Sequence, residues 1–423
     1  MTAAPAVVAV TPRRTGRLYR DAAALASSSM LTAVLGFGFW AICARFVAPA
    51  TLGVQTALMS IITAPAIVIA SGMGDAFTAL VPIAGRDAPA LVRRGYRRLL
   101  VTASALGLGA GTLAVTVLPE VRGSLSVAAL VAVGVVIWCL FVVQDPALTS
   151  LGRARWLPIE NGSVSLVKIG LLPLALAVGV AQPVVVASLL PCVAAIAVLR
   201  PQVSRLAAGH EGRSATVDAV AELPRLALRT TVSIAMSLGV LTATPFLVTA
   251  AAGPERGAVF SLALAIVQSL DFVGAALGVS LVVHASGKDA DGARMARIVL
   301  ARAAAIVGGG AVVLVLLSPF ALRLLDGRYL QLHGVVVIAL LALGSAGRCG
   351  YVIWAALQRA RRQMRALLTL NAVVASAVLA AIVPIASRWG AVGAAALVAG
   401  ANLFLTLCAG IHVAARHHAR RRR

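Results

Sequence analysis

Two long apolar segments near the N-terminus, within residues 22–81, constrain this chain more than any other feature. Each has about 20 or more residues with few charges, the length that a helix needs to cross a hydrocarbon core of about 30 Å. Arginine clusters lie before the first segment (13–20) and after the second (86–98), whereas the connecting turn, 48–53, carries no charge. Because cytoplasmic loops are enriched in Lys and Arg, we predict that both flanks are cytoplasmic and that the turn lies outside.

Apolar windows between charge clusters continue along the whole chain and predict twelve membrane-spanning helices. The predicted spans are 22–47, 54–81, 99–118, 127–151, 157–179, 182–199, 227–250, 257–284, 298–318, 334–357, 366–387 and 391–414. An even number of spans places the basic C-terminal tail, 415–423, in the cytoplasm with the N-terminal tail, 1–21. The predicted fold class is an all-α, multi-pass protein of the cytoplasmic membrane with both termini cytoplasmic.

The longest polar connection, 200–226, is predicted to be a cytoplasmic linker between two equal halves. We expect an N-terminal six-helix bundle at 22–199 and a C-terminal six-helix bundle at 227–414. Both halves begin in the cytoplasm, so an internal repeat would relate them by a pseudo-two-fold axis along the membrane normal. A central cavity is expected between the two bundles.

Composition excludes several classes of function. The chain is 60% hydrophobic and has a net charge of +23, but most of its 37 Lys and Arg residues lie in segments predicted to be cytoplasmic. The charge is therefore mainly a topology signal with anionic lipids as contacts, and no basic soluble domain is present to bind nucleic acid. No nucleotide-binding loop, metal-ligand cluster or nucleophile motif occurs, so we predict a transporter with no catalytic residue, cofactor or metal, and not an enzyme.

Two basic side chains lie deep inside predicted spans, where an ionised group costs about 2.5–3.5 kcal/mol and is a candidate functional residue. Lys168 is near mid-depth of the fifth span and forms an i, i+4, i+7 stripe with Asn161 and Ser165. Arg348 is near mid-depth of the tenth span, and the small residues within 344–350 leave room for a ligand beside it. We assign the side chains of Lys168, Asn161, Ser165 and Arg348 to substrate binding. The alternative for each charge is a static ion pair between helices.

Acidic side chains inside the spans are candidate sites for a coupling ion, H⁺ or Na⁺. Asp271 is near mid-depth of the eighth span, where a static pair is the alternative. Three acidic residues lie nearer the inner ends of spans: Asp75, Asp145 and Glu160. We assign Asp75 and Asp145 to ion coupling. The seventh span carries a polar stripe that we expect to border the cavity, with helix packing as the alternative; it includes Ser233 and Ser237.

The first 85 residues carry the most specific pattern. The run at 36–46 ends in an Ala-Arg pair before Phe46 and is followed by Ala48-Pro49-x-x-x-Gly53. The segment 71–75 and the inner ends of two later spans, 145–155 and 348–362, add to the pattern. Together they resemble the polysaccharide flippases of the multidrug/oligosaccharidyl-lipid/polysaccharide (MOP) exporter superfamily, with Ala48 in place of the usual serine.

The resemblance implies an alternating-access flippase that moves an undecaprenyl-diphosphate-linked oligosaccharide from the inner to the outer leaflet. The expected partners are this lipid-linked oligosaccharide, H⁺ or Na⁺, membrane lipids and proteins of polysaccharide assembly. The alternatives are a multidrug or small-molecule exporter, or a lipid II flippase, of the same superfamily. Two deep basic residues against one deep acidic residue favour an anionic substrate over a cation. A major-facilitator transporter is disfavoured because its Gly-x-x-x-Asp-Arg/Lys signature is missing from 85–98.

Overall fold

The structure of the protein is a computed structural model, and it describes residues 31–32, 34–210, 218–285, 292–360 and 364–421. Almost all of these residues are helical, and no strand occurs among them. The predicted N-terminal tail, 1–21, and the beginning of the predicted span 22–47 lie outside the described residues. The predicted all-helical fold class is confirmed.

The helices of the first half begin where the sequence favours helix initiation. The described part of the first helix is Val34–Phe46, and it is followed by α2 (Pro49–Ala84), a 3₁₀ turn (Gly85–Asp87) and α3 (Ala88–Val117). The remaining helices are α4 (Leu125–Val142), α5 (Gln144–Ser150), α6 (Leu157–Ala177) and α7 (Pro183–Ala208). A proline lies in the first turn of α2, α3, α6 and α7, where its missing N–H costs no helical hydrogen bond.

The second half begins at α8 (Ala219–Ile234), whose first turn is capped by the Asp218 side chain. A five-residue π-helix, Ala235–Gly239, joins it to α9 (Val240–Ala252). The remaining helices are α10 (Pro254–Ala285), α11 (Gly292–Leu325), α12 (Arg328–Gln331), α13 (Gly334–Ala360) and α14 (Met364–Arg421). Gly390, with a φ of 60°, interrupts α14 and divides it into two helices.

Eight helical stretches in the described part of the chain are long and apolar enough to cross a membrane. Several of them contain more than one helix; for example, Pro49–Val117 includes α2 and α3, Leu125–Ser150 includes α4 and α5, and Arg365–Ala415 includes both parts of α14. The chain is therefore a multi-pass membrane protein. The count of twelve spans, the cytoplasmic termini and the division into two six-helix bundles stay predictions.

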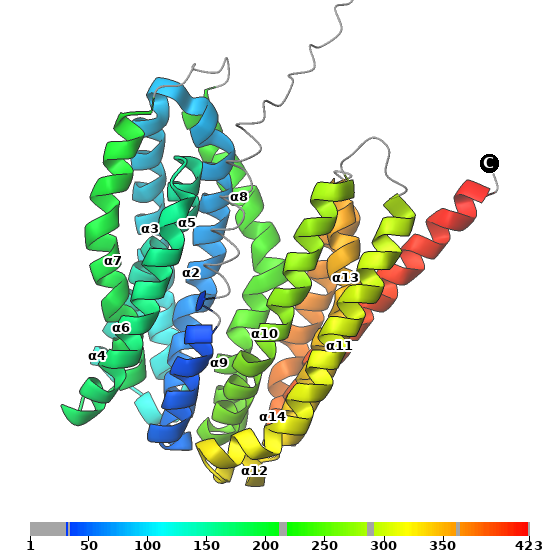
Figure 1. The fold of residues 1–423 in the computed structure, drawn as a ribbon. Coiled ribbons are helices and arrows are strands. Elements are labelled where there is room, and N and C mark those ends of the chain that lie inside the picture. Colours follow the sequence, from blue (N-terminus) through cyan, green and yellow to red (C-terminus); the bar gives the residue numbers. More distant parts are fainter. Residues whose placement is uncertain (1–30, 33, 211–217, 286–291, 361–363, 422–423) are drawn as a thin grey trace, which may run out of the picture.

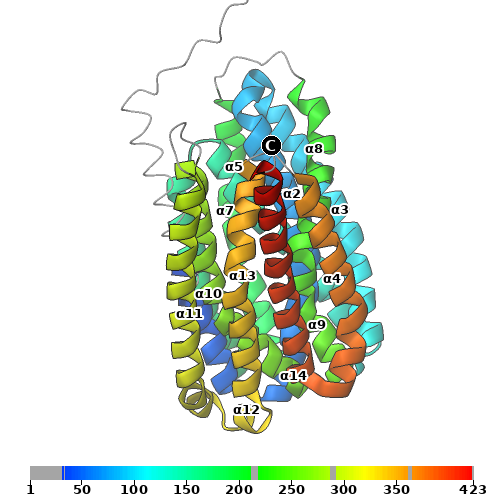
Figure 2. The same ribbon diagram turned by 90° about the vertical axis from the view of Figure 1, so that its right-hand side faces the viewer.

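The helices form two groups that meet at one end and diverge toward the other (Figure 1). The end that carries the arginine-rich segments 85–98 and 200–210 is called the basic end below, and the end that carries the turn 48–53 is called the opposite end. Figure 2 shows α11, α13 and α14 side by side in the second group, and α13 packs against both of the others. The basic end is the one predicted to be cytoplasmic.

Clusters of buried hydrophobic residues explain why the two groups of helices meet at the opposite end. At the opposite end, one buried cluster joins the two halves, because Phe39 and Val184 of the first half belong to it together with Phe260 of α10. Nearer the basic end, Leu223 of α8 is buried in a separate cluster with Phe77 of α2. The helix that opens the second half in the sequence thus packs on the first half at the basic end, and the π-helix lies where the chain passes from α8 to α9.

A serine of α2 bonds to α9 and so links the two halves close to the π-helix. The Ser60 hydroxyl donates to the backbone oxygen of Thr242 at 2.6 Å and accepts from the backbone nitrogen of Phe246 at 3.3 Å. Those two backbone groups are four residues apart in α9, and would pair with each other in an undisturbed helix. Pro245 already weakens the helix there, so the inserted hydroxyl satisfies both groups at the interface.

Replacing Gly53 by alanine is expected to weaken the contact between the halves at the opposite end. A Cβ at Gly53 would lie 1.8 Å from the backbone oxygen of Pro254, so the two backbones would have to separate. We expect a destabilisation of about 1–3 kcal/mol, measured by thermal unfolding in detergent. Gly109→Ala is the control, because its Cβ would meet nothing within 4 Å and alanine favours helix. Equal melting temperatures for the two variants would contradict this account.

Candidate functional site

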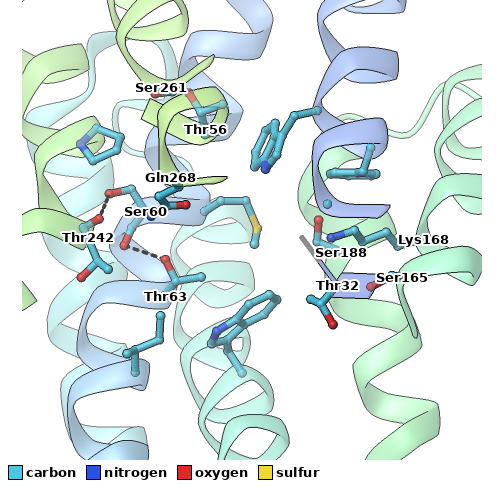
Figure 3. Close-up of a pocket in the computed structure, with 18 of the residues that line it drawn as sticks. Thr32, Thr56, Ser60, Thr63, Ser165, Lys168, Ser188, Thr242, Ser261 and Gln268 are labelled. Atoms are coloured by element: carbon cyan, nitrogen blue, oxygen red, sulfur yellow. Dashed lines mark hydrogen bonds between the residues drawn. The ribbon is translucent and has the colours of Figure 1, made fainter. Parts of the chain in front are cut away.

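A cavity of about 350 Å³ lies between helices of the two halves. Its walls come from the first helix, α2, α4, α6 and α7 on one side and from α9 and α10 on the other. Figure 3 shows polar side chains from both sides facing this space. The polar lining residues are Thr32, Thr56, Ser60, Thr63, Asn161, Ser165, Lys168, Ser188, Thr242, Ser261 and Gln268.

Lys168 carries the charge of this cavity, since no other described residue that lines it is basic or acidic. The helical period of α6 places it on one face with Asn161 and Ser165, and its side chain extends beside Ser188 (Figure 3). Its Nζ lies 4.6 Å from the ring centroid of Phe39, a cation–π contact. Among the described residues, no carboxylate lies within ion-pair distance of Lys168. A static ion pair, the alternative in the sequence analysis, is therefore not formed within this part of the chain.

Aromatic side chains give the cavity flat apolar surfaces beside its polar groups: Phe39, Trp40, Trp138 and Phe141. The indole N–H of Trp138 is buried and has no hydrogen-bond partner among the described residues. Buried indole N–H groups usually have a partner. This donor is therefore unsatisfied in the arrangement described here.

Asn161 connects the cavity to a second polar cluster nearer the basic end. Its Nδ2 donates to Oδ2 of Asp145 at 3.1 Å. Glu160 is buried, and neither of its carboxylate oxygens has a hydrogen-bond partner within the described ranges; the same holds for the amide of Gln144. Because a buried carboxylate is stable only when protonated or balanced by a positive charge, the cluster is a candidate site for a proton or a small cation.

Arg348 does not line the main cavity. It faces a separate cavity of about 80 Å³, which Ser237 also lines. Its Nη1 lies 3.7 Å from Oδ2 of Asp271, and Oδ1 of Asp271 accepts a hydrogen bond of 2.7 Å from Ser345. The two deep basic residues thus differ, because Arg348 has a carboxylate partner and Lys168 has none within the described residues. The structure does not bring them to one site.

Two further candidates lie away from the main cavity. Ser233 lines neither of the two cavities, and its backbone oxygen accepts a hydrogen bond from the Ser237 hydroxyl at 3.1 Å, next to the π-helix. Asp75 is an exposed residue of α2 and also lines neither cavity. The candidates that the structure brings together at the main cavity are therefore Lys168, Asn161 and Ser165, with Asp145 bonded to Asn161.

Sequence reasoning missed the polar face of α2. Thr56, Ser60 and Thr63 line the cavity and have the same i, i+4, i+7 spacing as the stripe on α6. That spacing is visible in the sequence. It was missed because these residues carry no charge, and uncharged serines and threonines inside membrane helices more often pack helices together.

No family model matches the chain, and no curated protein matches its sequence. Solved structures do match. The lipid II flippase MurJ in an inward closed conformation superposes with a TM-score of 0.75 at 12% identity, covering 91% of this chain and 86% of that one. An inward-facing multidrug resistance MATE transporter of the MOP superfamily gives 0.71 at 15% identity, covering 94% and 99%. A MATE in the straight conformation gives 0.65 at 16% identity, covering 96% and 97%.

The chain has the fold of these transporters. Identities this low establish the fold alone, and the fold agrees with the MOP superfamily that the residues at 36–53 resemble. The match extends over nearly the whole chain, so it includes both halves. Membership of the polysaccharide flippase group and the identity of the substrate stay predictions.

Proposed function

We propose that the protein is a flippase that moves an undecaprenyl-diphosphate-linked oligosaccharide from the inner to the outer leaflet of the cytoplasmic membrane. The observation that carries this proposal is the charge of the main cavity. Lys168 is a basic side chain in the cavity, without a carboxylate partner among the described residues. A charge in that setting is costly, and an anionic substrate would offset the cost.

The other lining groups suit a sugar attached to a diphosphate. Charge-assisted hydrogen bonds from Lys168 would hold the phosphate oxygens, while hydroxyl and amide side chains such as Ser165 and Gln268 would bond sugar hydroxyls. The volume of about 350 Å³ is toward the lower end of the range of about 300–1,000 Å³ found for ligand pockets, so the headgroup would enter in part.

Alternating access requires the contacts at the opposite end to open while the basic end closes. The hydroxyl of Ser60 and the close approach at Gly53 would be released in that change. The π-helix between α8 and α9 lies where the chain passes from one group to the other, and π-helices inside α-helices often mark functional sites. The arrangement described here would be the one open to the cytoplasm.

Ion coupling is assigned to the carboxylates that contact substrate-side groups. Protonation of Asp145, or a Na⁺ bound to it, would change its hydrogen bond to Asn161, a lining residue. Asp271 would act on Arg348 in the second half in the same way. The exposed position of Asp75 gives it the weakest support of the three.

Two alternatives share the fold. A lipid II flippase would bind the same diphosphate-sugar chemistry, and the likeness to MurJ favours it as the second candidate. A multidrug exporter for cations is less compatible with a cavity whose charge is positive. Proteins of polysaccharide assembly remain expected partners of the first function.

The test is transport in proteoliposomes with three substrates in parallel: an undecaprenyl-diphosphate oligosaccharide, lipid II and a lipophilic cation. We expect the oligosaccharide lipid to reach the outer leaflet faster than the other two cross. Depletion of the protein in cells should also leave this lipid on the inner leaflet. Preferential transport of lipid II would establish the second candidate, and transport of the cation alone would refute both flippase assignments.

A further inference from the structure

A second, more apolar space lies on the outer surface of the first half, along the seam between α6 and α7. It measures about 660 Å³ and runs from Trp156 and Gln202 to Val167 and Pro191. Small residues of α7, Ala194 and Ala195, are among those that line it. This space is called the α6–α7 groove below. The large apolar side chains on its rim are exposed, among them Ile159 and Val198.

The groove and the main cavity are separated by the thickness of one helix. Val164 of α6 lines both spaces. Other residues of α6 line one space or the other. Ser163 and Val167 line the groove, whereas Ser165 and Lys168 line the main cavity. On α7, Cys192 lines the cavity and its neighbour Pro191 lines the groove. A group bound at Lys168 therefore lies within one side chain of the groove.

The seam itself is thinly supported. Among the described helices, α6 packs chiefly against α7, and much of its surface is exposed, including Leu166 and Leu174. Gly170 has no neighbour within 4 Å of where a Cβ would lie, and Pro173, inside the same helix, removes one backbone hydrogen-bond donor. The outer face of the wall between cavity and groove therefore has few packed neighbours among the described residues.

The length of the groove matches one leaflet. Trp156 and Val167 are separated by about 16 Å along α6 at 1.5 Å per residue, which is about half of a 30 Å hydrocarbon core. Trp156 lies at the basic end, and tryptophans are enriched at membrane interfaces. The groove thus extends from the interface to the depth of Lys168.

We infer that the α6–α7 groove binds the polyisoprenoid chain of the carrier lipid while its diphosphate is held at Lys168 on the other face of α6. This inference rests on the proposed function and adds a site to it. It places the chain on the outer surface of the first half and not between the two halves. Val164 lies at the point where the chain would pass from the cavity into the groove.

The competing occupant is an ordinary phospholipid seated from the basic end. Its phosphate would lie beside the buried carboxyl group of Glu160, which lines the groove and offers the phosphate no positive charge. Arg153, whose guanidinium lies 5.9 Å from the ring centroid of Trp156, would attract it. A chain whose phosphate is bound at Lys168 avoids Glu160 and needs neither group. The experiment below separates the two occupants.

Photocrosslinking tests the site directly. A benzophenone amino acid is introduced at Val198, in the groove, and at Val101, which lines none of the cavities described and is equally exposed at 65%. The probe is alkyne-tagged undecaprenyl diphosphate in vesicles of phosphatidylethanolamine and phosphatidylglycerol. We expect crosslinking at Val198 to exceed that at Val101 by about five-fold or more, equivalent to about 1 kcal/mol of preference. Lys168→Met should abolish the difference, because the chain is then no longer anchored.

Equal crosslinking at the two positions would overturn the inference. So would a preference at Val198 that survives Lys168→Met, or that excess phosphatidylglycerol removes, since both indicate an ordinary lipid. Gel filtration and thermal unfolding of each variant confirm that it is folded. Because the readout needs no transport, its failure is distinct from failure of the proposed function, which would appear as loss of oligosaccharide-lipid transport by the unmodified protein.

A transport assay supplies the second arm. Ala194→Trp would fill part of the groove, and we expect about ten-fold slower transport of the undecaprenyl substrate, as for other steric blocks of a shaped site. An analogue with a two-isoprene chain should be slowed much less, because its chain would occupy only the beginning of the groove, next to Val164. Val193→Trp, on the same helix but outside the groove, is the control. Equal slowing of both substrates by Ala194→Trp would refute a site for the chain.

Discussion

Replacing Lys168 by methionine is expected to slow transport of the lipid-linked oligosaccharide by about 10- to 100-fold, because one or two charge-assisted hydrogen bonds of about 1.5 kcal/mol or more are lost. Stability should not fall. The ammonium has no carboxylate partner among the described residues, so its removal relieves a desolvation cost. Lys168→Arg should retain most activity. The measurement is transport in proteoliposomes, together with the melting temperature of each variant.

The control for this prediction is Arg94→Met. Arg94 is exposed on α3 at the basic end and lines no part of the main cavity. The Arg94→Met substitution removes one positive charge, as Lys168→Met does. An effect of total charge alone would therefore slow both variants alike. Full transport by Lys168→Met, at wild-type protein levels, would remove Lys168 from the site while leaving the fold untouched.

The fold was largely predictable because membrane helices are set by rules that act locally. Length, hydropathy and arginine placement indicate where the apolar part of each helix lies, but not where the helix begins: α3 begins at Ala88, ahead of the predicted span 99–118, and includes the arginines before it. Packing between helices is not encoded in this way. Nothing in the hydropathy of α8 indicates that Leu223 packs on α2 of the first half, because apolar surfaces in lipid gain little from one partner over another.

The site was predictable where a charge marked it. Lys168 was identified because an ionised group in hydrocarbon is expensive, and helical spacing then added Asn161 and Ser165 on the same face. Spacing could not reveal that Arg348 faces a different cavity, since that depends on how α13 packs against α14, which lines the same cavity. The Ser60 contact with α9 was also beyond sequence reasoning, because it needs two helices that are far apart in the chain.

Replacing Asp271 by asparagine is expected to show whether Asp271 and Arg348 form a static ion pair or a site for a coupling ion. Asp271→Asn should destabilise the protein by about 1–2 kcal/mol, since it leaves Arg348 partly buried without its carboxylate. Both side chains keep some exposure, at 22% and 29%, so the full cost of about 3–5 kcal/mol for a buried pair is not expected. Arg348→Gln should cost a similar amount, and the double variant should recover most of the loss. Thermal or denaturant unfolding measures all four members of the cycle.

Transport decides what the pair is for. If Asp271 carries the coupling proton or Na⁺, the double variant will regain stability and yet transport at a rate that no longer responds to an ion gradient. A static pair predicts that the double variant regains both stability and the ion response. The exposed pair of Asp326 and Arg328 is the matched control: Asp326→Asn should change neither quantity measurably, because solvent screens that interaction. Loss of the ion response in this control as well would mean that the response does not report on Asp271.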